Sequence, residues 1–181
     1  MHAGAPIHHE PTPDADSLRV ALRPGRPGDR DFVQSLSGAS FARLGAYDGI
    51  LTGWFDHASV NTTLATVEGS SVGFVMWAFV DREPDGPTPR VADVIAIAVE
   101  DAWRGKGIGR ALLRCALRQA SALAPSVGAR RIELSVAEDN PLAGGLFASE
   151  GFVRRPKDDV RYPGGQRCLR LARSFLPPAV V

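Results

Sequence analysis

The sequence predicts a single mixed α/β (α+β) domain, and three observations lead to that fold class. Two β-prone runs, 62–67 and 72–80, flank the turn-forming stretch "EGSS" and predict an antiparallel hairpin. The run 91–99, "VADVIAIAV", is apolar at nearly every position, which is typical of a central strand covered on both faces. From 108 to about 123, apolar residues recur at the spacing of an amphipathic helix.

The first part of the chain predicts a strand followed by a helix. "LRVALR", at 18–23, reads as a strand, and "RPGDRDFVQSL" indicates a loop that passes into a helix with Asp29 as its N-cap. Residues 41–61 are rich in aromatic side chains but show no clear period. The stretch "DREPDGPTP", at 81–89, has the composition of an exposed turn.

The second half predicts one more strand and helix and then short closing strands. "RIELSVA", at 131–137, reads as a strand. In the following "NPLAGGLFASEGF", Asn140 suits the N-cap, Pro141 the first helical position and Gly151 the helix end. Short strands near 152–155 and 168–171 complete the domain.

Composition limits the class of protein. A chain of 181 residues with 44% hydrophobic content is long enough for one domain with a sizeable core. The formal net charge of +1 gives no electrostatic reason to expect binding to nucleic acid or to a membrane surface. No apolar run approaches the roughly 18 residues of a membrane span, and the first residues do not have the pattern of a secretion signal. We therefore expect a cytoplasmic protein.

Cysteine usage fits a reducing compartment. The chain has two cysteines, Cys115 and Cys168, which form neither a metal-ligand spacing nor a disulfide framework. Cys115 falls on the apolar stripe of the predicted helix, so we interpret it as a core residue rather than a nucleophile. The ends, 1–17 and 174–181, are rich in proline without any period and predict loose tails. The histidines of the first tail receive no role, and no metal is expected.

The motif "RGKGIG" lies between the apolar strand and the amphipathic helix. Unpaired N–H groups and the helix dipole make a helix start of this kind an anion site, and phosphate is its natural guest. Glycines let the backbone come close to phosphate oxygens, while Arg104, Lys106 and Arg110 add positive charge. The Walker spacing G-x-x-x-x-G-K-S/T is absent, and the dinucleotide pattern G-x-G-x-x-G fails at Arg110. A merely structural turn is the remaining alternative, but it would not need three glycines and two cations.

Longer segments around this motif resemble the GCN5-related N-acetyltransferase (GNAT) superfamily. "VIAIAVEDAWRGKGIGRALL" resembles the family's acyl-CoA pyrophosphate-binding segment, whose pattern Gln/Arg-x-x-Gly-x-Gly/Ala is matched by Arg104, Gly107 and Gly109. "IELSVAEDNPLAGGLFASEGF" resembles the family's later strand, N-x-x-A helix start and closing G-F. "LRVALRPGRPGDRDFVQSL" is similar to its opening strand and helix. The resemblance covers roughly residues 18–173, as one domain.

The resemblance implies a fold and a cofactor. The expected fold is a twisted, mostly antiparallel sheet of about six to seven strands, with a splayed parallel pair in the middle and about four flanking helices. The expected cofactor is acetyl-CoA or another short acyl-CoA, without a metal. Its pyrophosphate would bind the loop, its pantetheine arm would pair with the strand, and Asn140 would lie close to that arm. The implied cofactor-binding set is Ile97, Ala98, Val99, Arg104, Gly105, Lys106, Gly107, Ile108, Gly109, Arg110, Asn140, Ala143 and Phe147.

The chemistry that the resemblance implies is direct attack of a primary amine on the thioester in a ternary complex. Asp93 is the candidate general base, because some family members carry a glutamate six residues before the position of Val99. Asp93 shares parity with Ile97 and Val99 unless a bulge intervenes, and a solvent-facing aspartate is the alternative. A backbone N–H near Val99 would polarise the thioester carbonyl.

One position departs from the family pattern. Phe147 stands where many members have the tyrosine that protonates the leaving thiolate, and phenylalanine cannot donate a proton. Tyr162 is a substitute acid, with a packing or surface role as the alternative. A second function therefore stays open, namely an acyl-CoA-binding or regulatory module with a degenerate site. The glycine pair 144–145 indicates either tight helix packing or space for a longer acyl group.

The acceptor is the least determined part of the prediction. We expect an amine on a small molecule or peptide, and the resemblance makes Tyr47, Trp54 and Phe55 candidate walls of its site, although each could equally be a core residue. His57 could act as a base but is interpreted as a surface residue. Both a monomer and a homodimer remain open.

Overall fold

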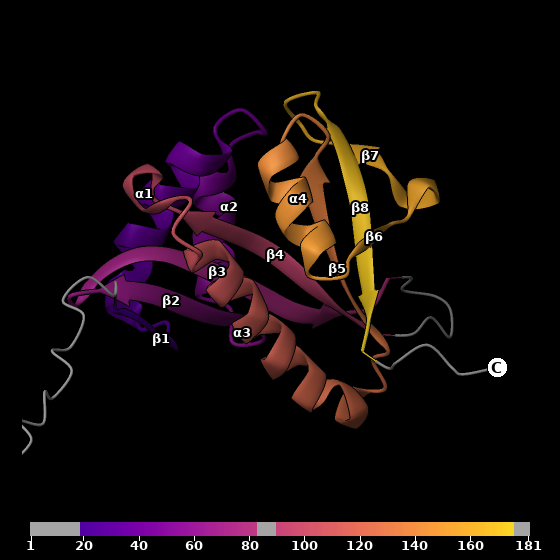
Figure 1. Cartoon of the computed structure of the whole chain (residues 1–181), viewed down its shortest axis with the longest axis horizontal. Helices are drawn as coiled ribbons and strands as arrows, with labels where there is room; N and C mark the ends of the chain where they lie inside the picture. The colour runs from indigo at the N-terminus through magenta and orange to yellow at the C-terminus, as the bar shows by residue number, and fades with distance from the viewer. Residues whose placement is uncertain (1–18, 83–89, 176–181) are drawn as a thin grey trace, which may run out of the picture.

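The computed structural model describes residues 19–82 and 90–175, which form a mixed α/β domain around one eight-stranded sheet (Figure 1). The strand order is β1-β2-β3-β4-β5-β8-β6, and β7 pairs with β8. Every pair is antiparallel except β4 with β5, which is parallel. The strands are β1 (Val20–Pro24), β2 (Asn61–Val67), β3 (Ser70–Val80), β4 (Val91–Val99), β5 (Arg131–Ala137), β6 (Val153–Arg154), β7 (Val160–Arg161) and β8 (Arg167–Ser174).

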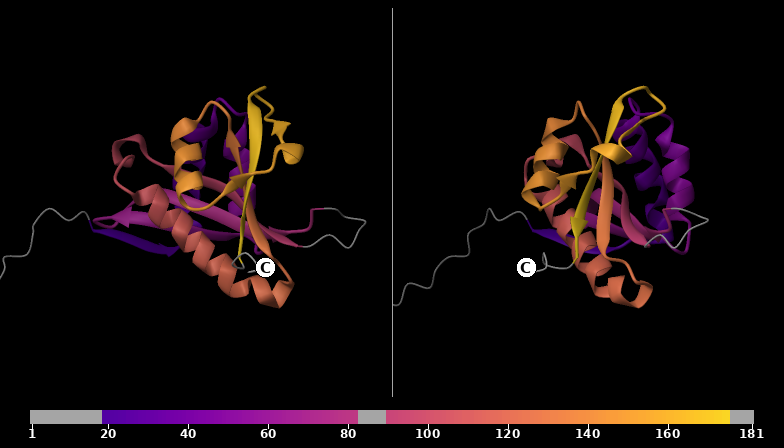
Figure 2. Two further views of the ribbon diagram at one scale, coloured as in Figure 1. Left: turned by 45° about the vertical axis from the view of Figure 1, so that its right-hand side comes forward. Right: turned by 90° about the vertical axis from the view of Figure 1, so that its right-hand side faces the viewer.

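Four α-helices cover the two faces of the sheet. Helices α1 (Arg30–Phe41) and α2 (Tyr47–Phe55) lie on one face, and α3 (Ile108–Leu123) and α4 (Pro141–Ser149) lie on the other, as Figure 2 shows. Each face buries its own apolar cluster. The sheet is therefore the middle layer of three, and a side chain on any strand faces one helix pair or the other.

The local predictions are confirmed for most elements. The predicted hairpin is β2–β3, closed by Glu68 and Gly69, which both have positive φ angles of 49° and 84°. The apolar run is β4, and the amphipathic stretch is α3 with the expected ends. Asn140 accepts a hydrogen bond from the N–H of Ala143 as the N-cap of α4, and Gly151 follows the helix with φ of 82°.

Other expectations are corrected. The region without clear period contains α2, and β7 was not predicted at all. Asp29 does occupy the N-cap position of α1, but its side chain does not cap the helix; it accepts from Arg23 at 2.7 Å and from the backbone N–H of Arg26. Residues 83–89 of the expected turn 81–89 and the expected tail 1–17 lie outside the described residues, whereas β8 extends to Ser174.

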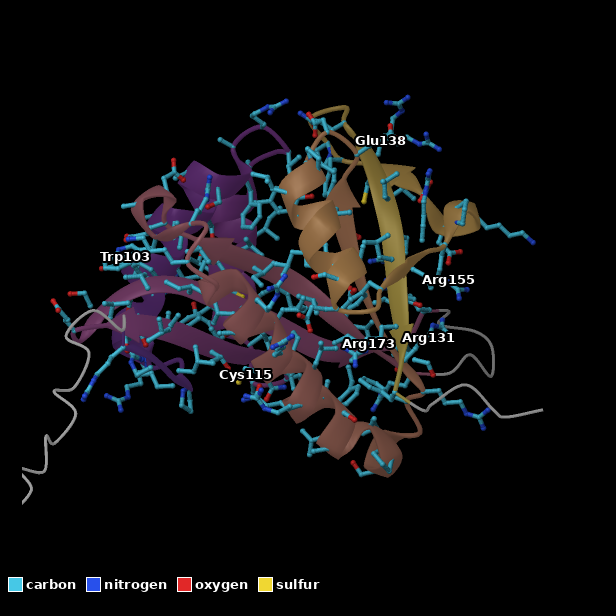
Figure 3. All side chains as sticks on the ribbon, in the orientation of Figure 1. Trp103, Cys115, Arg131, Glu138, Arg155 and Arg173 are labelled. Atoms are coloured by element: carbon cyan, nitrogen blue, oxygen red, sulfur yellow. The ribbon has the colours of Figure 1, made fainter. Side chains whose placement is uncertain are left out.

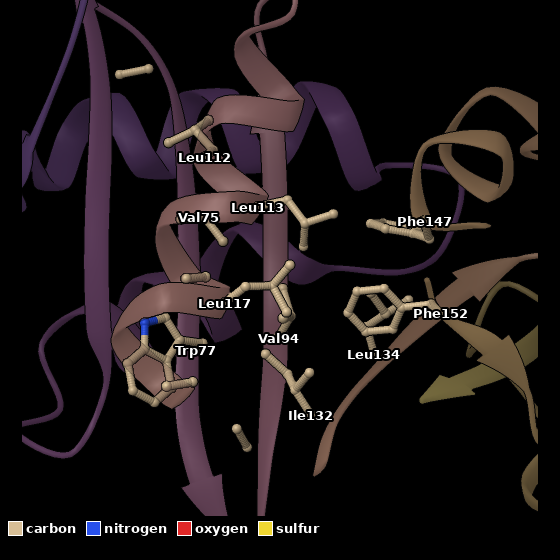
Figure 4. Packing of buried hydrophobic residues seen from close by; sticks show 14 of the residues in the cluster. Val75, Trp77, Val94, Leu112, Leu113, Leu117, Ile132, Leu134, Phe147 and Phe152 are labelled. Atoms are coloured by element: carbon tan, nitrogen blue, oxygen red, sulfur yellow. The ribbon is translucent and has the colours of Figure 1, made fainter. Parts of the chain in front are cut away.

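The larger core lies between the sheet and α3 (Figure 4). Trp77 of β3 is fully buried there, and its Nε1–H donates to Gln119 Oε1 of α3 at 3.1 Å, so its polar atom is satisfied. Leu113 and Leu117 of α3 and Val94 of β4 belong to the same buried cluster. Cys115 is half-buried on α3 and is not a member of the buried cluster, so the core assignment holds only in part.

The central strand β4 contains a bulge that changes which face its residues occupy. Met76 pairs with Ala96 and Trp77 pairs with Val94, so Ile95 has no partner in β3. Before the bulge, Ala92 and Val94 pack on the α3 side; after it, the side chains on that face are Ile97 and Val99. Asp93 therefore lies on the α1–α2 face, opposite to Ile97 and Val99.

The two parallel strands separate just after this point. Strand β4 pairs with β5 only from Ala92 to Val94, opposite Ile132 to Leu134. Beyond Val94, β5 continues along β8 while β4 continues along β3. The splayed parallel pair that the sequence implied is present, and it leaves one edge of β4 open.

The glycine pair in α4 generates a first prediction. A Cβ added at Gly145 meets nothing within 4 Å, so tight packing does not explain this glycine. Gly145→Ala should raise the free energy of unfolding by about 0.5–1 kcal/mol, because alanine loses less backbone entropy in a helix interior. Urea denaturation followed by circular dichroism measures this change.

Gly128→Ala is the matched control for that substitution. A Cβ at Gly128 also meets nothing within 4 Å, but the residue has φ of 70°. Because alanine is strained in the left-handed region, this variant should lose about 1–2 kcal/mol. Equal stability changes in the two variants would show that local backbone conformation does not decide either effect.

Candidate active site

A cavity of about 510 Å³ occupies the gap between the separating strands. Its walls come from both sides of the sheet, with β4 and β5 at its centre and α1, α2 and α4 around it. The lining residues are Ser40, Phe41, Arg43, Leu44, Tyr47, Leu51, Val94, Ile95, Ala96, Ile97, Leu134, Ser135, Val136, Ala137, Asp139, Asn140, Pro141, Leu142, Ala143, Phe147 and Tyr162. The cavity passes through the sheet layer, so two ligands can meet in it from opposite faces.

The open edge of β4 offers backbone hydrogen-bonding groups to this cavity. Glu100 N–H donates to Val72 O. Because the backbone groups of successive residues in a strand point to opposite edges, those of Ile97 and Val99 point away from β3. No strand pairs with β4 there among the described residues. An extended ligand can therefore pair with β4 at Ile97 and at the N–H of Val99, whose carbonyl oxygen accepts from Arg104.

The glycine loop before α3 presents a row of backbone donors. Gly105 and Gly107 have φ angles of 74° and 81°, and no side chain caps the helix at Gly107. Within the described residues, the first N–H of this segment with a backbone acceptor is that of Ala111, which donates to Gly107 O at 3.0 Å. The amides from 105 to 110 are free to bind an anion, and no acidic side chain lies in the first turn.

The cations of the loop are held by neighbouring groups. Arg104 contacts Asp101 at 2.8 Å and donates to the carbonyl oxygen of Val99, while the Lys106 ammonium lies 4.7 Å from the centre of the Trp103 ring, which Figure 3 places before α3. Arg110 contacts Glu150 at 3.2 Å. Because these contacts hold the charged side chains, the backbone amides without acceptors are the groups of the loop best placed to bind an anion.

Helix α4 supplies one wall of the cavity. Asn140, Ala143 and Phe147 all line it, and Phe147 is buried, with its ring 6.0 Å from the Phe152 ring. The glycine pair 144–145 does not line the cavity, so the idea of extra space for a longer acyl group is not supported. The wall at Phe147 is apolar and provides no proton.

Two tyrosines form the opposite wall. Tyr47 and Tyr162 line the cavity, with ring centres 6.3 Å apart in an edge arrangement. Burial raises the pKa of the Tyr162 phenol well above its usual value, and it also raises the pKa of Tyr47. Both phenols therefore stay protonated at neutral pH and can donate a hydrogen bond. The sequence identified both residues.

The other predicted acceptor residues lie away from the cavity. Trp54 is 40% exposed and contacts the ring of His57, with ring centres 5.9 Å apart. Phe55 packs against the apolar cluster between the sheet and helices α1 and α2. Neither Trp54 nor Phe55 is in the cavity lining. The interpretation of His57 as a surface residue agrees with its exposure.

Asp93 is also outside the cavity lining. Its carboxylate contacts Arg82 at 3.0 Å and Arg170 at 3.3 Å. Burial raises the pKa of the Asp93 carboxyl, while the two arginines oppose that effect. Asp93 lies on the α1–α2 face at the level where β4 and β5 are still paired, and the two arginines hold its carboxylate there, so it does not reach the cavity lining.

Sequence reasoning missed four polar residues of the cavity: Ser40, Arg43, Ser135 and Asp139. Arg43 and Asp139 form a 2.8 Å ion pair between loops that are far apart in sequence, and no local pattern indicates it. For Ser135 there was a signal, because polar and apolar residues alternate in "RIELSVA" and mark one polar face of β5. The described residues contain no group of three or more potential metal ligands and no helix long and apolar enough to cross a membrane.

Comparison with known proteins identifies the family of this architecture. Residues 30–152 match the family model described as the acetyltransferase (GNAT) family. Mycothiol acetyltransferase from Sanguibacter keddieii is 30% identical over 77% of this chain and 45% of its own length. The enzyme of that name from Amycolatopsis mediterranei is 36% identical over 60% of this chain and 34% of its own length. The chain thus spans less than half of these relatives.

Solved structures share the fold at low sequence identity. Arabidopsis thaliana NAA60 in complex with acetyl-CoA superposes with a TM-score of 0.68 at 15% identity, covering 86% of this chain and 98% of that one. The ribosomal-protein-S18-alanine N-acetyltransferase from Escherichia coli gives 0.67 at 17% identity, covering 90% and 99%. At these identities the likeness concerns the fold alone.

The glycine loop generates a second prediction. Gly107→Ala places a Cβ on a residue with φ of 81°, which strains the loop and shifts the free amides. We expect the dissociation constant of acetyl-CoA to rise about 10-fold, the equivalent of roughly 1.4 kcal/mol. Isothermal titration calorimetry measures it.

Gly128→Ala again provides the control, because its φ of 70° imposes comparable strain far from the loop. It should lose stability while binding acetyl-CoA normally. Unchanged binding by Gly107→Ala would exclude the loop as the anion site.

Proposed function

This chain belongs to the GNAT acetyltransferase family, and from that premise we propose that it transfers an acetyl group from acetyl-CoA to a primary amine of a small molecule or peptide. The transfer would be a direct attack in a ternary complex. Family members use acetyl-CoA, whose thioester supplies the activated acetyl group. No metal takes part in the proposed reaction.

One observation carries this proposal: the row of free amides before α3, the open edge of β4 and the cavity between β4 and β5 follow one another in space. The amides fit a pyrophosphate, and the edge at Ile97 and Val99 fits an extended amide-containing arm. The cavity then fits a thioester and an acceptor. A merely structural turn would not be followed by an unpaired strand edge.

The protein must present the acceptor as a free amine. For a lysine-like amine with a pKa of about 10.4, deprotonation at pH 7 costs roughly 4.6 kcal/mol, whereas an α-amine at about 7.7–8.0 costs roughly 1.4 kcal/mol at most. The role of Asp93 as a general base stays a prediction. Because Asp93 is not in the cavity lining, we favour an acceptor amine whose deprotonation at neutral pH costs little. The backbone N–H of Val99 would donate to the thioester oxygen.

The leaving thiolate needs a proton that Phe147 cannot provide. Tyr162 is the phenol we propose for that role, because it lines the cavity and remains protonated at neutral pH. Tyr47 would pack beside it and form part of the acceptor wall, with Trp54 and Phe55 outside.

The decisive experiment is a thiol-release assay with acetyl-CoA and a panel of amines. The panel contains polyamines, aminoglycosides, amino acids and short peptides, together with amines related to mycothiol because of the relatives' name. Calorimetry follows acetyl-CoA binding in parallel. Turnover of any member supports transfer and names the acceptor class, whereas absence of acetyl-CoA binding would refute the proposal.

A second function is favoured by Phe147 alone: an acyl-CoA-binding or regulatory module that does not turn its ligand over. Phe147 is 3% exposed and packs against Phe152, so it is an integral part of the apolar wall. Tight binding of acetyl-CoA without thiol release across the whole panel would support this function instead.

Tyr162→Phe gives the third prediction. Removal of the phenol should lower kcat by about 10²-fold or more with little change in acetyl-CoA affinity, since general acid catalysis contributes about 10²–10⁴-fold. Because burial raises the pKa of Tyr162, the wild-type rate should not fall between pH 7 and about 9 through ionisation of this group.

Tyr47→Phe is the matched control, because it removes the hydroxyl of the neighbouring ring in the same wall. A kcat loss under about 5-fold is expected there, the equivalent of roughly one hydrogen bond. Equal losses in both variants would argue against an acid role for Tyr162.

A further inference from the structure

A cluster of charged side chains crosses three strands on the sheet face away from α3 and α4. Asp93 and Glu133 lie opposite each other in the parallel β4–β5 pair, where two carboxylates repel. Arg82 separates them, with contacts of 3.0 Å to Asp93 and 2.9 Å to Glu133. Arg131 adds a 2.6 Å contact to Glu133, and Arg170 contacts Asp93 at 3.3 Å. We call these five residues the β4–β5–β8 charge cluster.

The cluster carries more positive than negative charge, since three guanidinium groups face two carboxylates. The side chain of Glu133 is only 3% exposed, and its carboxylate forms ion pairs with both Arg82 and Arg131. Arg131, labelled in Figure 3, is the first residue of β5, whereas the cavity is lined by residues 134–137 nearer the other end of the strand. Arg170, by contrast, has a further partner beyond the cluster.

Arg170 connects the cluster to the cavity through Ser135. The two residues are register partners in the β5–β8 pair, and Arg170 Nη1 donates to Ser135 Oγ at 2.8 Å. Ser135 lines the cavity at the level where β4 and β5 separate. A serine oxygen has two lone pairs, so Ser135 keeps one lone pair and its own proton available for a ligand. Both side chains lie on the face from which Tyr47 closes the cavity.

We propose that Ser135 is a substrate-contacting residue that accepts an N–H from the acceptor amine, and that Arg170, held by Asp93, is its positioning residue. The proposal rests on the proposed acetyltransferase function. The hydrogen bond orients the amine so that its lone pair faces the thioester carbon. The charge of Arg170 disfavours the ammonium form of the acceptor amine and so lowers the free-energy cost of deprotonating it. Among the described residues, no carboxylate in the cavity centre provides this assistance.

The atoms balance in the reaction that this arrangement serves. A C–N bond forms between the acceptor nitrogen and the acetyl carbon while the C–S bond of the thioester breaks. The amine nitrogen gives up one proton, and the sulfur leaves as a free thiol. Ser135 and Arg170 are unchanged at the end.

Several charged and titratable groups surround Arg170 and share its field. On β4 and β5 these are Asp93 and Glu133, with Arg82 and Arg131 bound to them. From the segment before β7, Asp159 accepts the Arg170 backbone N–H at 3.1 Å, and Asp158, paired with Arg155 at 2.7 Å, also interacts with the charge of Arg170. Arg170 also lowers the pKa of Tyr162, against the larger effect of burial, so its charge reaches the cavity wall. Cys168 and Tyr47 are the remaining titratable groups at that wall.

Two coenzyme A thioethers test the proposal without a known acceptor. S-(2-aminoethyl)-CoA places an amine near the position of the attacking nitrogen, and S-propyl-CoA has the same shape without the amine. Calorimetry at pH 9 compares both ligands with wild type, Ser135→Ala and Arg170→Gln. Each variant should lose about 5- to 10-fold in affinity for the aminoethyl compound, a typical effect of one hydrogen bond, and none for the propyl compound.

Arg131→Gln is the matched control, because it removes one guanidinium of the cluster without touching Ser135. It should bind both thioethers as wild type does. A loss equal to that of Arg170→Gln would mean that the cluster only maintains the sheet, and unchanged aminoethyl binding by Ser135→Ala would overturn the proposal. If wild type binds neither thioether nor acetyl-CoA, the proposed function itself fails.

The pH dependence provides a second readout that a structural role would not change. In wild type, affinity for S-(2-aminoethyl)-CoA relative to S-propyl-CoA should rise from pH 7 to pH 10, because the site prefers the neutral amine. In Arg170→Gln this rise should be smaller, since the group that disfavours the ammonium is gone. A rise of the same size in both proteins would contradict the electrostatic part of the proposal.

Discussion

The unpaired residue in β4 is the constraint on which the site depends. Because Ile95 has no partner in β3, the faces of β4 exchange at this point, and the strand separates from β5 immediately afterwards. Beyond this point the backbone groups of Ile97 and the N–H of Val99 point away from β3, toward the side where no strand pairs with β4 among the described residues. A single inserted residue thus provides the strand edge and the gap together, while β3 holds the rest of β4 in place.

Local sequence predicted the elements well and their assembly less well. Hydrophobic periodicity and turn-forming or capping residues predicted the hairpin, α3 and the capped start of α4, because each of these signals is contained within a few residues. Helix α2 could not be recognised from its own periodicity, because its two glycines and the exposed Ile50 and Trp54 obscure the apolar pattern. The bulge could not be predicted from the sequence. A strand that is apolar at nearly every position does not show which residues face which side of the sheet. The face of Asp93 was therefore undetermined from sequence.

The same distinction separates the two halves of the candidate site. The proposed anion-binding half is one loop and one helix start, so the short motif "RGKGIG" was sufficient to predict it. The acceptor half combines Tyr47, Ser135 and Tyr162, which come from α2, β5 and the segment after β7. Sheet topology alone brings them together, and no spacing in the sequence reports it. Family resemblance pointed to the region but not to Ser135.

Phe147 and Tyr162 face the same cavity from opposite sides of the sheet, and this placement changes the meaning of the missing tyrosine. A hydroxyl absent from α4 is present on the wall formed by the β7–β8 turn. That turn also contacts the α1–α2 loop, where the N–H of Gly164 donates to the carbonyl of Leu44 at 2.9 Å. The proposed proton donor and the proposed acceptor wall are therefore parts of one connected surface. In such an arrangement, whatever positions the acceptor also positions the phenol, so loss of the α4 hydroxyl need not mean loss of catalysis.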